Sequence, residues 1–150
     1  LPASAALNNA TGFLAPNSEK TFTIPSTASR AISVGAYNSS NNSYAAFSGR
    51  GYSLTGAGFA LAKPDICAPG VSINAGGRTF TGTSFATPFV TGSAAIMMEW
   101  GIVRGNDPFL YGEKLKAYLI NGAKPLPGYI AVPNAATGWG ALCTRSSLPL

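Results

Sequence analysis

The sequence predicts an α/β fold with a mostly parallel sheet. Short segments of alternating or continuous apolar residues, typical of strands, come before two segments with helical periodicity. The first helical segment is apolar almost all the way round, which is typical of a helix buried in a core. Strands that alternate with helices, one of them buried, favour a layered α/β arrangement.

The strand signals lie in the first half of the chain. AISVGAY, residues 31–37, has apolar residues at alternate positions and is expected to be a buried strand. The polar run over residues 38–43 is expected to be a surface loop, and residues 48–60 form a glycine-rich stretch. The segment ICAPGVSINA then gives two short apolar pieces with a turn at Pro69-Gly70, and Arg78–Phe80 follows as a short strand.

Two helices are expected after these strands. The first spans residues 84–100, where Pro88 cannot donate a hydrogen bond to the preceding turn and should loosen or kink it. The second runs from about residue 108 to 121 and stops at Gly122. Lys114 and Lys116 are expected on its solvated face.

Composition limits the classes of protein to consider. The 150 residues are 46% hydrophobic and 10% charged, which suits one compact domain with a sizeable core. Residues 1–20, rich in Ala, Asn and Pro, are expected to be a connecting segment, and residues 21–150 the domain itself. The net charge of +5 comes from scattered basic residues, so no nucleic-acid partner is expected. No apolar stretch approaches the roughly 18 to 20 residues of a membrane span.

The two cysteines do not form a motif. Cys67 and Cys143 are far apart in sequence and lack the C-x-x-C spacing of a zinc or redox site. Cys67, between apolar neighbours, is expected to be a small buried hydrophobic residue. A disulfide between the two remains open.

The string RTFTGTSFATPFV, residues 78–90, contains the strongest candidate for chemistry. Ser84 falls in the first turn of the expected helix, where unpaired backbone N–H groups suit an oxyanion. Gly82 allows another chain to approach closely, so residues 80–83 are expected to form a wall along which a substrate backbone passes. A serine nucleophile needs a general base, usually histidine, and the chain has none. Because serine is also an ordinary helix cap, these features alone do not decide.

The whole string resembles the serine motif of the subtilisin-like serine proteases, the subtilases. GTSFATPFVTG, residues 82–92, stands against the common Gly-Thr-Ser-Met-Ala-Thr-Pro-His-Val-Ala-Gly. Over about residues 21–148, further segments resemble subtilase segments in the same order: IPSTASRAISVGAYN, YAAFSGRG, KPDICAPGVSINA and GWGALCTRSSL. The resemblance implies a three-layer subtilisin-like sandwich, of which this chain holds only the C-terminal part.

A narrower resemblance is to subtilases of clostridia and related bacteria, which include the spore-germination proteases. Phe85 and Phe89 in place of the common Met and His carry it, with MMEWGIVRGNDPFLYGEKLKAYLINGAKPLPG and TGFLAPNSEKTFTIPSTA. It implies an inserted domain before Leu1 and a secreted or spore-associated protein. The chain starts at Leu1 rather than Met and is expected to be cut from something longer.

The resemblance also assigns the site. Ser84 is implied to be the nucleophile of an endopeptidase acting on peptide or protein substrates, with Gly82 and Thr83 in its loop and Thr23 at the base of a substrate pocket. In subtilases the serine follows the catalytic Asp and His along the chain. Those residues and the asparagine of the oxyanion hole would therefore lie in an upstream part of the same parent chain. The isolated chain is expected to be inactive.

Three other positions are assigned by the same resemblance. Asp65, in the KPD turn, is expected to be structural rather than catalytic. Pro25 matches a position that can be a cis proline. The loop over residues 37–43 lies where some subtilases bind a cation, but it carries no carboxylate. A solvated loop is favoured, and no cofactor, calcium included, is supported by the sequence.

Other classes of protein remain as alternatives. A pseudoprotease that binds or regulates a partner is one, because the upstream Asp and His are outside this chain. An α/β-hydrolase elbow is disfavoured, since Ala86 stands where its motif has glycine and no histidine follows Ser84. A simple non-enzymatic domain would explain the composition but not the ordered motifs.

Overall fold

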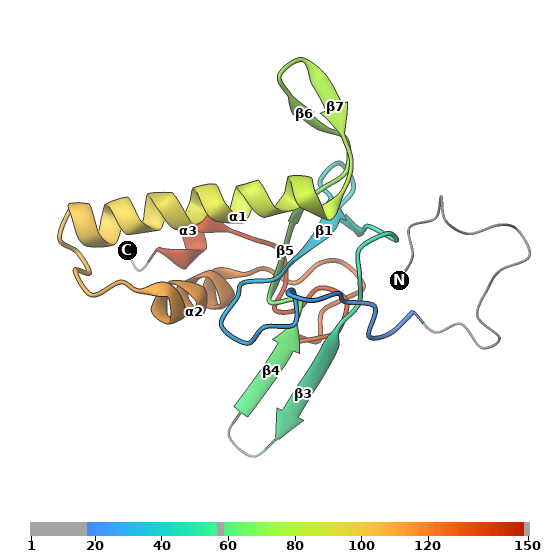
Figure 1. Cartoon of the computed structure of the whole chain (residues 1–150), viewed down its shortest axis with the longest axis horizontal. Helices are drawn as coiled ribbons and strands as arrows, with labels where there is room; N and C mark the ends of the chain where they lie inside the picture. The colour runs from blue at the N-terminus through green and yellow to red at the C-terminus, as the bar shows by residue number, and fades with distance from the viewer. Residues whose placement is uncertain (1–17, 57–58, 149–150) are drawn as a thin grey trace, which may run out of the picture.

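The computed structural model describes residues 18–56 and 59–148, with the backbone alone for residues 54–56 and 59–61. The predicted connecting segment therefore lies almost wholly outside the described residues. In chain order (Figure 1) the elements are β1 (Val34–Asn38), β2 (Ser43–Tyr44), β3 (Tyr52–Gly56), β4 (Phe59–Lys63), β5 (Ile66–Pro69), β6 (Ile73–Ala75), β7 (Arg78–Phe80), α1 (Thr83–Met98), the π-helical turn η2 (Glu99–Val103), α2 (Gly112–Gly122) and α3 (Thr144–Ser147).

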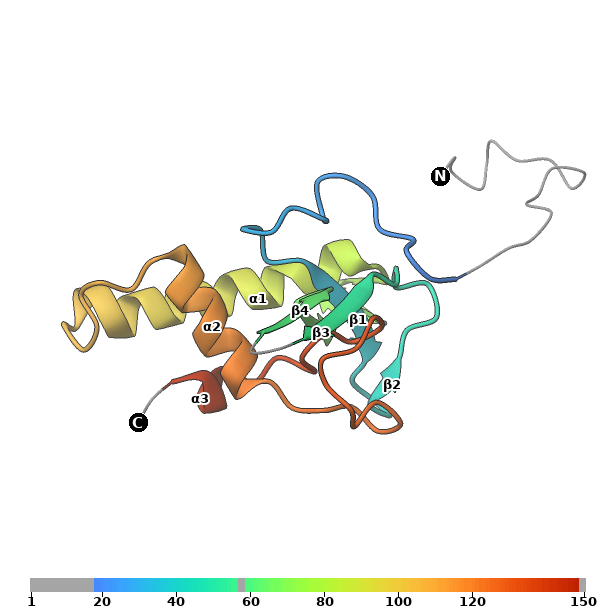
Figure 2. The same cartoon turned by 90° about the horizontal axis from the view of Figure 1, so that it is seen from below.

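The central sheet has the strand order β2-β1-β5. β1 and β5 are parallel, with Val34 opposite Ile66, and β2 runs antiparallel to the end of β1. Helix α1 packs on β1 and β5, and α2 lies against α1 and α3 (Figures 1 and 2). The α/β prediction is confirmed, and in the described part of the chain its sheet is mixed, with one parallel pairing.

Two antiparallel hairpins stand outside the central sheet. β6 and β7 form the hairpin that projects beyond α1, and β3 and β4 form one on the opposite side (Figure 1). The β3–β4 hairpin pairs Tyr52 with Lys63. Its strands were not predicted from the sequence, in which most of this segment is a glycine-rich stretch. The polar loop is confirmed on the surface, where Asn38 Oδ1 accepts hydrogen bonds from the N–H and hydroxyl of Ser40.

The core lies between α1 and the β1–β5 pair. Its buried members are Ala36, Ala45, Ile66, Ala68, Ala86, Val90, Met97, Leu110, Leu115 and Leu119. Gly70 lets α1 come close to the sheet, because a Cβ there would lie 2.7 Å from the Ala36 Cβ and 3.3 Å from that of Ala86. Burying these side chains is the main force holding α1 against the strands.

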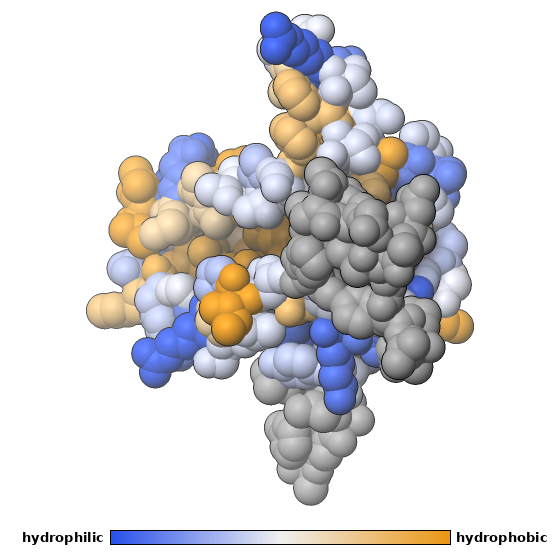
Figure 3. Space-filling view, turned by 45° about the vertical axis from the view of Figure 1, so that its right-hand side comes forward, coloured by the Kyte–Doolittle hydropathy of each residue, from blue (hydrophilic) through white to orange (hydrophobic). Residues whose placement is uncertain are grey.

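Within the described residues α1 is buried on one face, whereas its apolar sequence had predicted burial all round. Its buried positions, Ala86, Val90, Ser93 and Met97, follow one helical face. One flank of this face exposes large apolar side chains, with Phe89 42% exposed and Ile96 53% exposed. Apolar surface also gathers on the α1 side of the molecule in Figure 3. α1 continues through Pro88 without a break, and the loosening or kink expected there stays a prediction.

α2 corrects two further expectations. It begins at Gly112 rather than near residue 108, and Gly122 is its last residue rather than the stop beyond it. A Cβ on Gly122 would lie 2.3 Å from Ser147 Oγ, so glycine is required there for close packing against α3. Lys116, predicted on the solvated face, instead reaches inward to Asp65, because its side chain spans the gap between α2 and β5.

Candidate active site

The position of Ser84 is set by the join between β7 and α1. Gly82 is the N-cap of α1, with φ 155° and ψ 159°, a conformation that favours glycine. Its N–H donates to the carbonyl of Gly70 at 2.8 Å, which ties the start of α1 to the end of β5. The rings of Phe80 and Phe85 stack at 4.7 Å between centroids and fix β7 against the first turn.

Ser84 is not a helix cap. The N-cap is Gly82, and no side chain of the described residues caps the first turn. Ser84 itself is exposed, and its hydroxyl makes no hydrogen bond within the part of the chain that the structure describes. The first N–H groups of a helix lack intrahelical partners. A free hydroxyl therefore stands beside backbone donors at the positive end of the helix dipole, an arrangement suited to attack on a carbonyl.

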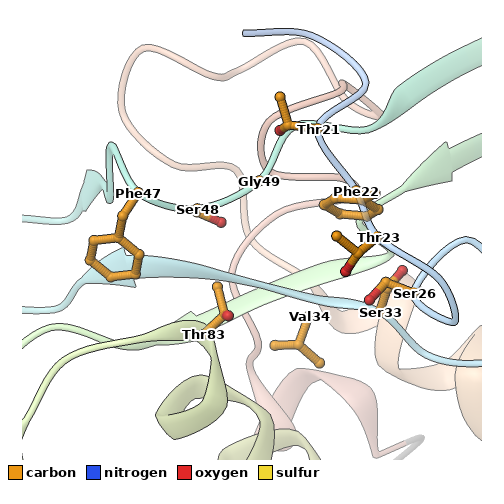
Figure 4. Close-up of a pocket in the computed structure, with 10 residues that line it drawn as sticks. All are labelled: Thr21, Phe22, Thr23, Ser26, Ser33, Val34, Phe47, Ser48, Gly49 and Thr83. Carbon is orange, nitrogen blue, oxygen red and sulfur yellow. The ribbon is translucent and has the colours of Figure 1, made fainter. Parts of the chain in front are cut away.

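Two adjoining pockets open beside this turn. The first, of about 310 Å³, is lined by Thr21, Phe22, Thr23, Ser26, Ser33, Val34, Phe47, Ser48, Gly49 and Thr83 (Figure 4). The second, of about 300 Å³, is lined by Pro25, Ser26, Ala31, Ile32, Ser33, Val34, Thr83, Ser84 and Thr87. Four residues are common to both, so the pockets share a wall made by β1, the segment before it and the start of α1.

The structure brings most of the predicted site residues together. Ser84 lines the second pocket, Thr23 the first, and Thr83 both, while Gly82 lies next to them as the helix cap. In Figure 4 the side chains of Thr23, Ser26 and Ser33 gather at one end of the first pocket, away from Phe47. The peptide bond between Ile24 and Pro25 beside them is cis, which agrees with the matched family position.

Sequence reasoning missed part of the pocket wall. Ser26, Ser33 and Phe47 line a pocket, yet none was selected as a site residue. A signal existed for Phe47, which belongs to the segment YAAFSGRG, and for Ser33, a hydroxyl within an otherwise apolar strand segment. No periodicity could show that both face the turn carrying Ser84.

Asp65 is buried beneath this wall and saturated with hydrogen bonds. Its side chain is 3% exposed. Lys116 Nζ lies 2.6 Å from Oδ1, and Lys63 Nζ lies 2.7 Å from Oδ2. Oδ2 also accepts from the Ser33 N–H at 2.7 Å and the Ser33 hydroxyl at 3.0 Å. This arrangement agrees with the structural role expected for Asp65.

Three charged side chains, those of Lys63, Asp65 and Lys116, meet in this cluster. Burial lowers the pKa of Lys63, and the hydrogen bond and charge of Asp65 oppose that shift. Neither pocket is lined by a histidine or another ionisable side chain among the described residues. The described residues therefore offer a free hydroxyl and backbone donors here, and no side chain lining these pockets could act as a general base.

The cysteines do not offer a second nucleophile at this site. Both are free thiols in the structure. Cys67 is buried as predicted, and burial raises its pKa to about 12, so it stays protonated at neutral pH. Hydrogen bonds with Ser146 lower the pKa of Cys143, which lines neither pocket beside Ser84.

Residues 18–56 and 59–148 contain no group of three His, Cys, Asp or Glu side chains that could hold a metal ion. None of the helices described here is long and apolar enough to cross a membrane.

Comparison with known proteins gives consistent matches. A family model described as the subtilase family, peptidase S8, matches residues 3–140. The serine protease AprX of Bacillus subtilis (strain 168) is 32% identical over 138 residues, which cover 75% of this chain and 29% of AprX.

Solved structures agree with these sequence matches. The CspB protease of Clostridium perfringens aligns with a TM-score of 0.80 and 46% identity, over 95% of this chain and 30% of CspB. The prenylagaramide maturation protease PagA aligns with a TM-score of 0.59 and 27% identity, over 83% of this chain and 43% of PagA. The chain thus spans less than a third of the length of AprX and CspB. The similarity to the CspB protease confirms the predicted resemblance to a clostridial branch.

Proposed function

Because the chain belongs to the subtilase family, we propose that it is the C-terminal part of the catalytic domain of a serine endopeptidase, with Ser84 as nucleophile. One observation carries the proposal. The Ser84 hydroxyl is exposed and has no hydrogen bond within the described residues, at an uncapped helix start beside two pockets. A capping serine would accept a hydrogen bond from the first turn, and a buried packing serine would bond within the protein.

The proposed reaction is peptide-bond hydrolysis through an acyl-enzyme. Ser84 Oγ attacks the substrate carbonyl as a base takes its proton, and the backbone N–H of Ser84 donates to the oxyanion that forms. The base then protonates the leaving amine, and water releases the acyl group by the reverse sequence. The base, its orienting carboxylate and a second oxyanion donor would come from an upstream part of the parent chain. We propose no organic cofactor.

Two surfaces support a longer parent chain. Phe89 and Ile96 expose an apolar stripe on α1, which is costly unless another part of the protein covers it. The carbonyl of Ser33, just before β1, accepts from Ile66, and that of Tyr37 accepts from Gly70, just after β5. Because backbone groups alternate in direction along a strand, those of Val34 point to the other side. No described strand pairs with Val34 there. An upstream strand and helices would cover both surfaces.

A reactive fluorophosphonate on the full-length protein tests the proposed function. We expect covalent labelling at Ser84, detected by mass spectrometry, and loss of labelling and of peptide hydrolysis in Ser84→Ala. The purified 150-residue chain should hydrolyse peptides no faster than its own Ser84→Ala variant.

Absence of labelling in a folded full-length protein would contradict the proposal and favour a pseudoprotease that binds a partner. Ser84-dependent hydrolysis by the 150 residues alone would contradict the need for an upstream part. The resemblance also leads us to propose a secreted or spore-associated protein, which cell fractionation would test.

A further inference from the structure

The Asp65 cluster connects α2 to the wall of the pockets beside Ser84. Lys63 Nζ donates to the carbonyl of Ala31 at 2.7 Å as well as binding Asp65. Lys116 Nζ donates to the carbonyl of Ser29 at 3.0 Å and to that of Ala31 at 3.3 Å. Both lysines therefore hold the same short stretch of backbone.

That stretch forms pocket wall. Ala31 and Ser33 line the second pocket, and Ser33 also lines the first. The N–H and hydroxyl of Ser33 are held by Asp65. Backbone carbonyls and a strand-end serine in a connecting segment would otherwise have water as their partner and could move. The cluster thus determines where residues 29–33 lie relative to Ser84.

Lys116 is the member of the cluster that comes from a separate element. Lys63 and Asp65 are two residues apart at the join of β4 and β5, whereas Lys116 lies on α2. Its side chain is 16% exposed, and it supplies a second cation to a carboxylate that already has Lys63. Balancing the single charge of Asp65 needs only one lysine. The second contributes hydrogen bonds to Ser29 and Ala31, which act on the wall itself.

We infer that Lys116 is a positioning residue for the proposed peptidase site, acting through Asp65 and residues 29–33 to set the shape of the pockets beside Ser84. The inference rests on the proposed function for its kinetic consequence. Its structural consequence, a wall held from α2, is independent of whether the protein cleaves peptides.

Lys116→Met in the full-length protein tests the inference, because methionine keeps the aliphatic stem and removes the ammonium group. We expect the KM for a peptide substrate to rise about 10-fold, with kcat and the rate of Ser84 labelling by a small fluorophosphonate within about threefold of wild type. Lys116→Arg keeps the charge, so its KM should lie close to the wild-type value. Lys116→Gln serves in its place if the methionine variant does not fold.

Lys114→Met is the matched control. Lys114 lies on the same helix and pairs with Asp107 at 2.6 Å, and neither residue lines a pocket beside Ser84. Loss of the Lys114 ammonium group should leave the KM for the peptide substrate unchanged. Amide hydrogen exchange provides the readout that needs no activity: Lys116→Met should speed exchange in residues 29–33 about threefold or more, and Lys114→Met should not.

The outcomes separate the two proposals. Unchanged exchange in residues 29–33 together with an unchanged KM overturns the positioning role, whatever the enzyme does. Faster exchange in a protein whose Ser84 cannot be labelled supports the positioning role and contradicts the proposed function. A fall in kcat with constant KM would also overturn the inference, because it would place Lys116 in the chemical step.

Discussion

Asp65 and Ser84 lie on either side of the same pocket wall, and their side chains are held in opposite ways. The Asp65 carboxylate is buried, accepts three hydrogen bonds, one of them from Lys63, and forms a further ion pair with Lys116. The Ser84 hydroxyl is exposed and has no partner within the described residues. Ser33 lies between them, bound to Asp65 and lining both pockets.

The difference is the one expected between a structural polar group and the nucleophile that we propose Ser84 to be. A buried polar group stabilises a fold only when all its hydrogen bonds are made, which leaves none for a substrate. A nucleophile must keep its hydroxyl available until the substrate and base arrive. Both residues lie in motifs of the same family, so the motif alone does not say which role each has. Burial and hydrogen bonding support one assignment for each.

Removing the carboxylate of Asp65 should have the largest effect on stability. Asp65→Ala leaves Lys63, which is 0% exposed, without its counter-charge. Breaking a buried ion pair from one side typically costs about 3–5 kcal/mol. We expect a loss of that size in urea unfolding of the full-length protein, seen as a lower midpoint or as failure to fold.

Two further variants sharpen this expectation. Asp107→Ala removes a carboxylate whose partner Lys114 is 36% exposed, and it should cost clearly less. The double variant Asp65→Ala/Lys63→Met should be more stable than Asp65→Ala, because the unpaired buried charge is gone. If Asp65→Ala unfolds at the wild-type midpoint, the Asp65 carboxylate does not have the structural role expected for it.

Cys67 is buried, as Asp65 is, and its thiol should lower the free energy of unfolding at alkaline pH. Burial holds its pKa at about 12 in the folded protein, against an ordinary value of 9.0. Because the folded pKa is raised, its contribution is complete below pH 9 and is lost as pH rises towards 12. At pH 11 the loss attributable to this thiol is about 2.5 kcal/mol.

The measurement compares unfolding at pH 8 and pH 11 for wild type, Cys67→Ala and Cys143→Ala. Cys67→Ala should lose less stability between the two pH values than wild type does. Cys143→Ala should lose at least as much stability as wild type over this range, since hydrogen bonds with Ser146 lower the pKa of the folded Cys143 thiol and a lowered folded pKa adds stability as pH rises. Equal pH dependence in all three proteins would mean that the pKa of Cys67 is the same in the folded and the unfolded protein.

Much of the fold was predictable because its signals are local. The alternation over residues 31–37 and the helical pattern after Thr83 are set by which face each residue buries. The exposed face of α1 was not predictable. The sequence pattern shows which positions of the helix are apolar, but not which of them another part of the protein covers. The β3–β4 hairpin was missed because its glycines suggested a loop.

The candidate site divides in the same way. Ser84, Gly82, Thr83 and Thr23 were selected by resemblance, and three of them line the pockets. Lys116 was assigned to solvent because helix position alone placed it on the polar face. Its pairing with Asp65, 51 residues earlier in the chain, depends on the packing of α2 against the strands, which no local pattern records.

The smallest effect on stability should come from Ser84 itself, and a second serine of the same pocket gives a matched comparison. Ser84→Ala removes an exposed hydroxyl with no hydrogen bond in the described chain, so unfolding should change by no more than about 0.5 kcal/mol. Ser33→Ala removes a buried hydroxyl that donates to the Asp65 carboxylate at 3.0 Å, and it should cost about 1.5–3 kcal/mol. Fluorophosphonate labelling of the full-length protein should show the reverse order, being abolished in Ser84→Ala and retained in Ser33→Ala. A Ser84→Ala protein destabilised as much as Ser33→Ala would show that the Ser84 hydroxyl is structural, and the contrast with Asp65 would no longer hold.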